Sequence, residues 1–373
     1  MHSREREELF ININPLQTAG RTRAAVRKAV TRFVDGYSVC DACAGILHDI
    51  EKPPIKSLTR ELTEFLNVDE ARTTAGAREA KFMVMHSECR PGDILALDGN
   101  AHYSTFVAAA RAGLETAEVP AGPPPFFKIT ADAYAQTLAD VKARTGRPAA
   151  LALLTHVDGD YGNLTDAAAI AAVCREAEVP LLLNTAYTTG RMPVDVRALG
   201  ADFVACSGHK SWGACGPIGV VGAIGERAAH LFRLDERFPK KNIELLGCTA
   251  RGSNIMSLME ALPLVKQRIL KWDEELENAR WFAARMEQIG KGGIKLLGDN
   301  PTNHDLMRFA TPLFHEIGQR QRKKGYFLHK ELTDRGITGL KPGQTQWFKM
   351  STYGLSRSQV EYLAQAFEEI AAL

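Results

Sequence analysis

The sequence predicts an α/β protein whose large domain is built on a mostly parallel sheet, with a smaller α+β domain at the C-terminal end. Two observations carry this prediction. Short apolar runs alternate with helical stretches between residues 58 and 255, which is the pattern of repeated strand–helix–strand units. From residue 256 the pattern changes to one long amphipathic helical stretch and then a mixed region. We therefore expect an N-terminal segment at residues 1–57, a large domain at 58–255 and a small domain at 256–373.

The individual elements follow from the spacing of apolar residues. Alternating or continuous apolar runs bounded by turn residues predict strands, and apolar residues every three or four positions predict helices. The expected helices lie at residues 21–33, 58–66, 80–86, 104–112, 166–177, 255–289 and 356–371, and the expected strands at 93–97, 149–155, 180–184, 201–206, 217–223, 306–310 and 348–351. Active sites of such sheets lie beyond the carboxyl ends of the strands. Residues that follow the strands at 180–184 and 201–206 are therefore the first candidates for a functional site.

The composition is that of an ordinary globular protein. Apolar residues make up 45% and charged residues 24% of the chain, so extended disorder is not expected. A formal charge of +2 argues against a chain coated in positive charge and leaves room for a local basic patch. The charged start of the chain lacks the apolar core of a secretory signal, and no run reaches the ~20 apolar residues of a membrane span. We expect a cytoplasmic protein without a membrane partner.

The strongest chemical signal is the segment Ser207-Gly208-His209-Lys210, which follows a predicted strand. A lysine amine can attack an aldehyde to form a Schiff base, and the neighbouring hydroxyl and imidazole groups can bind a phosphate. The glycines nearby let the backbone approach a cofactor closely. The alternative is a surface lysine in a turn, and the companion motifs favour the cofactor lysine over it.

The first companion motif is a glycine-containing turn that opens a helix at residues 73–79. Free backbone N–H groups and the positive end of the helix dipole make such a turn a phosphate site, lined here by Ala77 and Arg78. Arg78 can add charge-assisted hydrogen bonds. An ordinary helix start with an exposed arginine is the alternative.

Together, these motifs predict pyridoxal 5'-phosphate (PLP) as cofactor and the PLP-dependent aminotransferase-like fold (fold type I). In this fold a strand-end Asp usually meets the pyridine nitrogen, and the matching residue here is Asn184. An amide cannot hold the ring nitrogen protonated by ion pairing, so we expect a weaker electron sink, sufficient where the β-substituent leaves easily. His102 follows another strand, where this fold places a ring that stacks on the cofactor; a hydrogen-bonded turn histidine is the alternative.

A further loop, at residues 155–162, resembles the one that reaches the phenolic oxygen of the cofactor in cysteine-desulfurase-like enzymes. Either His156 or Asp158 could make this contact. The residues alone do not distinguish between the two, and we name Asp158 as the candidate cofactor-binding residue of this loop.

Seven cysteines, an odd number in a chain expected in a reducing compartment, do not indicate a disulfide framework. Cys40 and Cys43 form a C-x-x-C pair, a spacing typical of redox or metal chemistry, and Cys248 lies in a glycine-flanked loop. If the three meet, they could carry a persulfide or ligate an iron–sulfur cluster. The alternative is three unrelated cysteines. A closed zinc site needs four ligands, and the sequence shows no fourth ligand clustered with these three, so such a site is less expected.

Much of the chain resembles the O-phosphoseryl-tRNA:cysteinyl-tRNA synthase family of methanogenic and related archaea. The resemblance covers nearly the whole chain in register and is carried by residues 13–18, 36–43, 52–55, 76–79, 183–187, 190–194 and 207–212. The cysteine-bearing N-terminal segment and Asn184 separate this family from ordinary cysteine desulfurases. One departure is Ala80, where the family pattern has glycine; it should only stiffen the helix start.

The resemblance implies β-replacement on phosphoserine esterified to tRNA(Cys), giving cysteinyl-tRNA(Cys) and phosphate. It also implies a homodimer, and a complex with phosphoseryl-tRNA synthetase is a further expectation. By resemblance, Lys210 holds PLP, Asn184 faces the pyridine nitrogen, His102 covers the ring, the phosphate is lined by Ala77, Arg78, Ser207, Gly208 and His209, and sulfur is handled by Cys40, Cys43 and Cys248. His102, His209 or Arg251 could assist departure of the substrate phosphate by charge.

The tRNA would be held by positive charge. Basic residues gather at Arg320, Arg322, Lys323 and Lys324, and at residues 240–241, although solvated charged turns are the alternative.

Two other functions are compatible with the predicted fold and the lysine motif. A cysteine desulfurase or β-lyase would act on a free amino acid, and a non-catalytic tRNA-binding subunit would have lost activity. The N-terminal motifs argue against the first, and Lys210 with its companions argues against the second.

Overall fold

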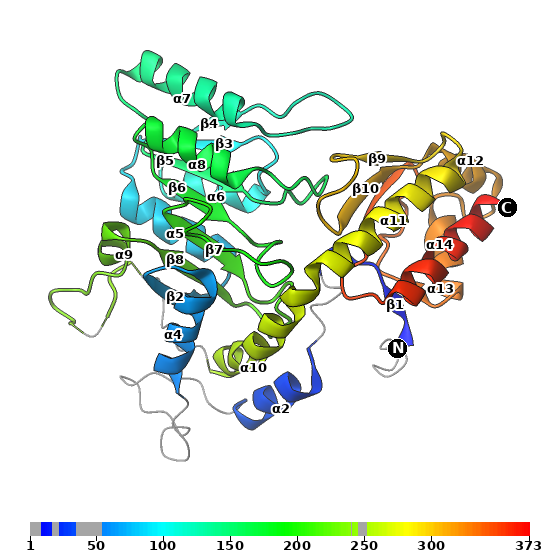
Figure 1. The fold of residues 1–373 in the computed structure, drawn as a ribbon, viewed down its shortest axis with the longest axis horizontal. Helices are drawn as coiled ribbons and strands as arrows, with labels where there is room; N and C mark the ends of the chain where they lie inside the picture. The colour runs from blue at the N-terminus through cyan, green and yellow to red at the C-terminus, as the bar shows by residue number, and fades with distance from the viewer. Residues whose placement is uncertain (1–8, 17–21, 35–53, 240, 245–251) are drawn as a thin grey trace.

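The computed structural model describes residues 9–16, 22–34, 54–239, 241–244 and 252–373. In Figure 1 a large sheet-based unit and a smaller unit lie side by side, and the helices α10 (Ser253–Arg268) and α11 (Trp272–Gly290) run from one to the other. Between the two helices lies one 3₁₀ turn, Ile269–Lys271. The helical stretch predicted as continuous is therefore interrupted at these residues.

The large unit is built on a sheet whose strand order, in the described part of the chain, is β2-β8-β7-β6-β5-β3-β4. Pairing is parallel from β7 through β6, β5 and β3 to β4, and β8 is antiparallel to both of its neighbours. The strands are β2 (Glu70–Thr74), β3 (Ile94–Asp98), β4 (Glu115–Val119), β5 (Leu151–Thr155), β6 (Leu181–Asn184), β7 (Phe203–Ser207) and β8 (Gly219–Ala223). This arrangement confirms the predicted α/β class with a mostly parallel sheet.

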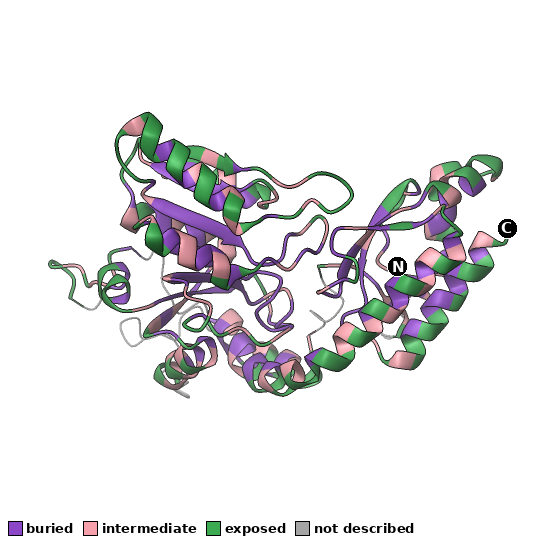
Figure 2. Ribbon diagram, turned by 45° about the horizontal axis from the view of Figure 1, so that its top comes forward, coloured by how far each residue is buried: buried purple, intermediate pink, exposed green. Residues whose placement is uncertain are grey.

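Helices cover both faces of this sheet, because its central strands are apolar on both sides. Along β5, Leu151 and Leu153 pack into one hydrophobic cluster, while Ala152 and Leu154 pack into another. One face carries α5 (Ala77–Glu88), α6 (Tyr103–Arg111) and α9 (Glu226–Leu231); the other carries α4 (Ile55–Leu66), α7 (Ala131–Thr145), α8 (Ala167–Glu176) and α10, with α2 (Ala24–Arg32) against α10. Figure 2 shows the buried strands between half-exposed helices.

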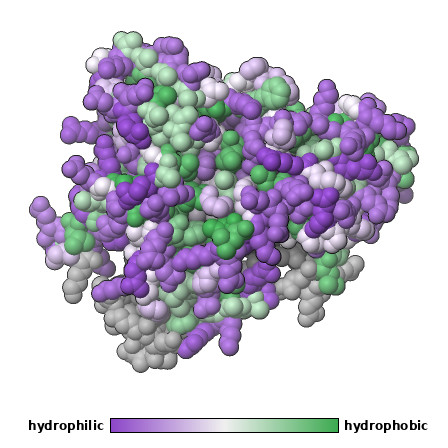
Figure 3. All heavy atoms as spheres, in the orientation of Figure 1, coloured by the Kyte–Doolittle hydropathy of each residue, from purple (hydrophilic) through white to green (hydrophobic). Residues whose placement is uncertain are grey.

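The small unit has its own hydrophobic core. Its antiparallel sheet has the order β12-β10-β9, and a short parallel pair joins β1 to β11. The elements are β1 (Ile11–Asn12), β9 (Lys295–Leu297), β10 (Leu306–Ala310), α12 (Pro312–Arg320), a 3₁₀ turn at Lys324–Tyr326, α13 (Phe327–Asp334), β11 (Ile337–Thr338), β12 (Trp347–Ser351) and α14 (Arg357–Ala371). On the face seen in Figure 3, hydrophilic side chains cover both units, with apolar ones scattered among them.

Several elements were not predicted from the sequence. Strands β2 and β4 lie at the two edges of the large sheet and carry polar residues, because an edge strand is only partly covered. Helix α7 was also not predicted, although Tyr134, Leu138 and Val141 bury one of its faces. The other predicted elements are present, with bounds shifted by a few residues.

The two hydrophobic cores indicate where the chain divides into the large and the small unit. Residues of α10 pack into the core of the large unit, whereas Ile11 and Ile13 pack into the core of the small one. We therefore propose that the division lies at the 3₁₀ turn 269–271 rather than at residue 255, and that β1 belongs to the small unit.

Among the described helices, none combines the length and the apolar character that a membrane crossing requires.

Candidate active site

The predicted motifs converge on a cavity of about 450 Å³ at the carboxyl ends of β5, β6 and β7. Those strands end in Thr155, Asn184 and Ser207, all three of which line the cavity. The start of α5, the start of α6 and the turn after β7 supply the other walls. Of the residues predicted for the site, the cavity is lined by Ala77, Arg78, His102, Asn184, Ser207, His209 and Lys210.

Lys210 lies in the turn that follows β7, and its Nζ is 3.9 Å from the centre of the Tyr187 ring. Burial, and secondarily the positive charge of Arg191, lower the pKa of Lys210 to about 8. An amine with this pKa is neutral in a substantial fraction near neutral pH, and the neutral amine is the nucleophile that attacks an aldehyde.

Helix α5 begins at the cavity with Ala77 and Arg78, whose backbone N–H groups belong to the first helical turn. Gly76 precedes them with φ +123°, a conformation that L side chains rarely adopt, and a Cβ there would lie 3.3 Å from Cε1 of His209. Glu79 accepts a hydrogen bond from the backbone N–H of Ala75. The helix start thus presents donors to an anion in a space that requires glycine.

Hydrogen bonds to the backbone hold two further side chains in place, the imidazole of His209 and the amide of Asn184. Nδ1 of His209 lies 2.9 Å from the carbonyl oxygen of Ile218, so the ring is anchored on its Nδ1 side. Asn184 is buried at the end of β6, and its Oδ1 accepts from the N–H of Ala186 at 3.3 Å. Both side chains line the cavity in fixed positions, as a cofactor site requires.

His102 caps the start of α6 at the mouth of the cavity. Its Nδ1 accepts from the N–H of Ser104 at 3.3 Å and lies 2.8 Å from the Ser104 hydroxyl. Partial removal from water, followed by the positive charges of Lys210 and Lys81, lowers the pKa of His102 to about 4. The ring is therefore neutral at physiological pH, although the side chain stands at the rim.

Three residues predicted near the cofactor do not line the cavity. Asp158 is buried, and its carboxylate accepts from the backbone N–H groups of Asp160, Tyr161 and Asn163 at 2.9, 2.6 and 3.2 Å, so it shapes its own loop. His156 is buried with Nδ1 3.1 Å from Oγ1 of Thr188.

The third is Gly208, where a Cβ would lie 3.1 Å from the side chains of Ile218 and Leu258. A side chain at this position would therefore crowd Ile218 and Leu258, so close packing requires glycine here. From the loop that was expected to supply Asp158 or His156, Thr155 and Gly159 line the cavity instead.

The sequence interpretation missed Lys81, which is 1% exposed and lines the cavity. Its Nζ donates to the hydroxyls of Ser104 at 2.9 Å and Thr105 at 2.7 Å. Burial and the charge of Lys210 lower the pKa of Lys81 to about 7. The signal in the sequence is a lysine one turn after the turn predicted to bind phosphate, on a helix whose neighbouring residues are apolar.

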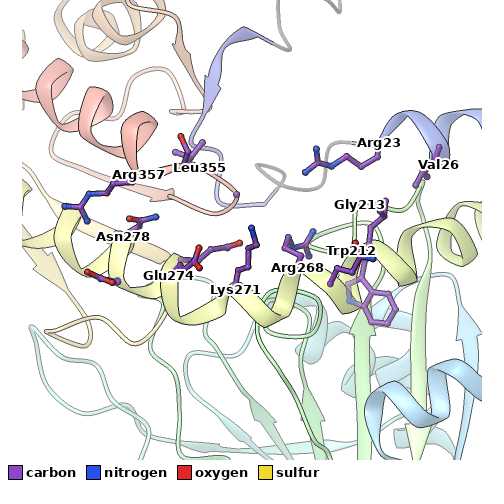
Figure 4. A pocket seen from close by; sticks show the side chains of 17 residues that line it. Arg23, Val26, Trp212, Gly213, Arg268, Lys271, Glu274, Asn278, Leu355 and Arg357 are labelled. Atoms are coloured by element: carbon purple, nitrogen blue, oxygen red, sulfur yellow. The ribbon is translucent and has the colours of Figure 1, made fainter.

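A second, larger cleft of about 1080 Å³ lies between α2, the α10–α11 junction and the residues before α14. Figure 4 shows Arg23, Arg268 and Lys271 on its walls, with Glu274 close by. None of the residues predicted for the site lines this cleft. The larger volume would favour this cleft as a ligand site, but the residues predicted to carry the chemistry line the smaller cavity.

The residues predicted to handle sulfur lie outside the described part of the chain; these are Cys40, Cys43 and Cys248. Arg251 and Lys240, predicted to assist phosphate departure and to bind tRNA, also lie outside it. Burial raises the pKa of the Cys89 and Cys174 thiols to about 12 and that of Cys206 to about 11. Within the described ranges, no group of three or more His, Cys, Asp or Glu side chains could hold a metal ion. The basic residues Lys241, Arg320, Arg322, Lys323 and Lys324 are exposed.

Comparison with known proteins places the chain in a family. A family model described as O-phosphoseryl-tRNA(Sec) selenium transferase, SepSecS, matches residues 87–372. The chain is 49% identical over 368 residues to the O-phospho-L-seryl-tRNA:Cys-tRNA synthase of Methanothermobacter thermautotrophicus, covering 99% of this chain and 97% of that relative. It is 50% identical over 361 residues to the enzyme of the same name from Methanosarcina acetivorans, covering 96% and 93%.

Solved structures agree. A crystal structure of a SepCysS–SepCysE N-terminal domain complex superposes with a TM-score of 0.91 at 45% identity, covering 100% of this chain and 96% of the other. A cysteine desulfurase from Thermococcus onnurineus has a TM-score of 0.77 at 15% identity, covering 97% and 95%, which confirms the predicted fold alone. The chain belongs to the O-phospho-L-seryl-tRNA:Cys-tRNA synthase family.

Proposed function

We propose that this protein converts O-phosphoseryl-tRNA(Cys) into cysteinyl-tRNA(Cys), replacing the phosphate at Cβ by sulfur with the help of PLP held by Lys210. One observation carries the proposal beyond family membership. The cavity is lined by the cationic side chains Arg78, Lys81 and Lys210, and Glu79 is the sole carboxylate on its described walls. Glu79 binds the backbone of Ala75. Such a cavity suits two phosphate groups, one from the cofactor and one from the substrate.

The residues present fit PLP. Lys210 offers a buried amine whose pKa is about 8, and Gly76 leaves room at the helix start for a phosphate. Ala77, Arg78, Ser207 and His209 would hold that phosphate. When bound, PLP takes up the electron pair that is left on the substrate Cα when its proton is removed.

The chain's own residues account for the proton transfer. Nζ of Lys210 accepts the Cα proton, and its pKa of about 8 suits a base that works near neutral pH. Asn184 would meet the pyridine nitrogen of bound PLP with an amide, which would make the ring a weaker electron sink than a carboxylate partner would. This suffices because phosphate is a good leaving group. The positive charge of Arg78 stabilises the departing phosphate.

Sulfur delivery and assembly belong to the same proposal. Cys40, Cys43 and Cys248 carry the sulfur, as a persulfide, through a disulfide or on an iron–sulfur cluster. Exposed basic residues on the small unit, Arg320, Arg322, Lys323 and Lys324, contact the tRNA backbone. The protein acts as a homodimer and associates with phosphoseryl-tRNA synthetase; the SepCysE complex of the similar structure supports a protein partner.

The test uses purified protein loaded with PLP under anaerobic conditions, with sulfide and phosphoseryl-tRNA(Cys). Cysteinyl-tRNA(Cys) should form with the unaltered protein and not with Lys210→Ala. A control substitution at Lys271, which lines the other cleft, should leave product formation intact. Product formation by Lys210→Ala without an added amine would refute the assignment of the lysine.

A further inference from the structure

A chain of hydrogen bonds runs from the buried side of α5 to the ring of His102. Nζ of Lys81 donates to Oγ of Ser104 at 2.9 Å and to Oγ1 of Thr105 at 2.7 Å. Oγ of Ser104 in turn lies 2.8 Å from Nδ1 of His102. Lys81, Ser104 and Thr105 are 1%, 7% and 0% exposed, so the chain links a buried amine to a ring at the cavity.

The direction of these hydrogen bonds fixes the proton on the ring. The backbone N–H of Ser104 donates to Nδ1 of His102 at 3.3 Å, and an N–H cannot accept. The Ser104 hydroxyl accepts from Lys81, so its own hydrogen is available to Nδ1 as well. Nδ1 is therefore the acceptor, and the proton of the neutral imidazole lies on Nε2.

The charges around His102 act in the same direction. Lys81 and Arg78 reach it from α5 and Lys210 from the turn after β7, and all three oppose a positive charge on the ring. Asp160, from the loop after β5, opposes them more weakly, and the Tyr103 ring lies tilted against the His102 ring with the two ring centres 4.4 Å apart. Asp98, at the end of β3, acts on Lys81 and favours its charged form.

We propose that Lys81 is a positioning residue that, through Ser104 and by its charge, holds His102 neutral with its proton on Nε2. The role of the ring in catalysis rests on the proposed function. A neutral ring can stack on the cofactor and donate a hydrogen bond from Nε2 to an oxygen of the departing phosphate. It supplies no positive charge, so stabilisation of the departing phosphate by charge must come from other side chains of the cavity, Arg78 among them.

The test follows His102 by NMR in the PLP-loaded protein labelled with ¹³C,¹⁵N-histidine, with its signals assigned by their loss in His102→Gln. The ¹⁵N shifts should show an unprotonated Nδ1, and the ring should not titrate above pH 6. Lys81→Met, which keeps the length and removes the charge, should raise the midpoint of His102 by about one pH unit or more. Lys81→Arg should keep the midpoint low.

Ser104→Ala separates the two effects. It removes the hydroxyl and leaves the charge of Lys81, so the midpoint should stay low while the preference for the Nε2–H form weakens. A protonated Nδ1 in the unaltered protein would overturn the proposal without any variant. So would an unchanged midpoint in folded Lys81→Met. Since no readout is activity, the proposal stands or falls separately from the proposed reaction.

Discussion

The guanidinium of Arg191 donates to the carboxylate of Asp305 at 2.6 Å, and both side chains are fully buried. Arg191 also donates to Oγ of Ser211, the residue after Lys210, at 2.7 Å, and to the carbonyl oxygen of Pro15 at 2.8 Å. One side chain thus joins the N-terminal segment, the large unit and the small unit directly beside Lys210, the proposed cofactor lysine. This buried contact is one of several that hold the two units together, alongside the hydrogen bond from Tyr353 to the carbonyl oxygen of Gly190.

Asp305→Asn should lower the free energy of unfolding by about 3–5 kcal/mol, because it leaves the Arg191 charge buried without its ion-pair partner. Urea denaturation at a fixed protein concentration measures the change. Glu361→Gln breaks the exposed ion pair of Arg357 on α14 and should cost less than about 1 kcal/mol. Equal losses in the two variants would contradict the role given to the buried pair.

The rate at which the PLP-free protein takes up PLP should rise with pH through about 8 and level off above it. The neutral amine of Lys210 reacts with the aldehyde, and it forms as pH rises through its pKa. Arg191→Met removes a positive charge that lowers this pKa, so the midpoint should move to higher pH. Absorbance stopped-flow gives the profile. A rate that still rises with pH beyond 9 without levelling off would exclude a lowered lysine pKa.

Asn184→Asp should raise the pKa of the PLP ring nitrogen, because a carboxylate stabilises the protonated ring and an amide does not. The cofactor spectrum, titrated with pH, reports this change. Asn300→Asp, an exposed amide of the small unit, serves as the control and should leave the spectrum unchanged. An unaltered ring-nitrogen pKa in Asn184→Asp would remove this residue from the cofactor site.

Gly76→Ala should weaken PLP binding by about tenfold or more. The residue has φ +123°, and the added Cβ would crowd His209 at 3.3 Å, where the phosphate is expected. Gly146→Ala also adds a Cβ at positive φ (+73°), in the left-handed helical region, which costs an L residue less than the conformation of Gly76, and nothing lies within 4 Å of that Cβ. This control should lose about 1 kcal/mol of stability and bind PLP normally, as fluorescence titration would show. Similar PLP affinities in both variants would argue against a phosphate site at α5.

Much of the fold could be predicted from the sequence, because strands buried on both faces are continuous apolar runs. The edge strands β2 and β4 were not predicted, because partly exposed strands carry polar residues and lack a continuous apolar run. The Arg191–Asp305 contact spans 114 positions of the chain, and nothing in the local pattern pairs these two residues.

The site was predictable where a motif sits at a strand end, as Asn184 and Lys210 do. The direction of the Asp158 side chain could not be predicted, because it depends on the backbone of its own loop, whose N–H groups it binds. Lys81 was overlooked because a single lysine in a helix looks like a solvated side chain until the neighbouring helix α6 is placed over it.

The most direct test of the proposed function compares phosphoseryl-tRNA(Cys), free phosphoserine and free cysteine as substrates for the PLP-loaded protein under anaerobic conditions with sulfide. The account predicts that only the tRNA-bound phosphoserine is converted, to cysteinyl-tRNA(Cys) and phosphate. Sulfur release from free cysteine, with the phosphoseryl-tRNA(Cys) unchanged, would contradict it and identify a desulfurase acting on a free amino acid.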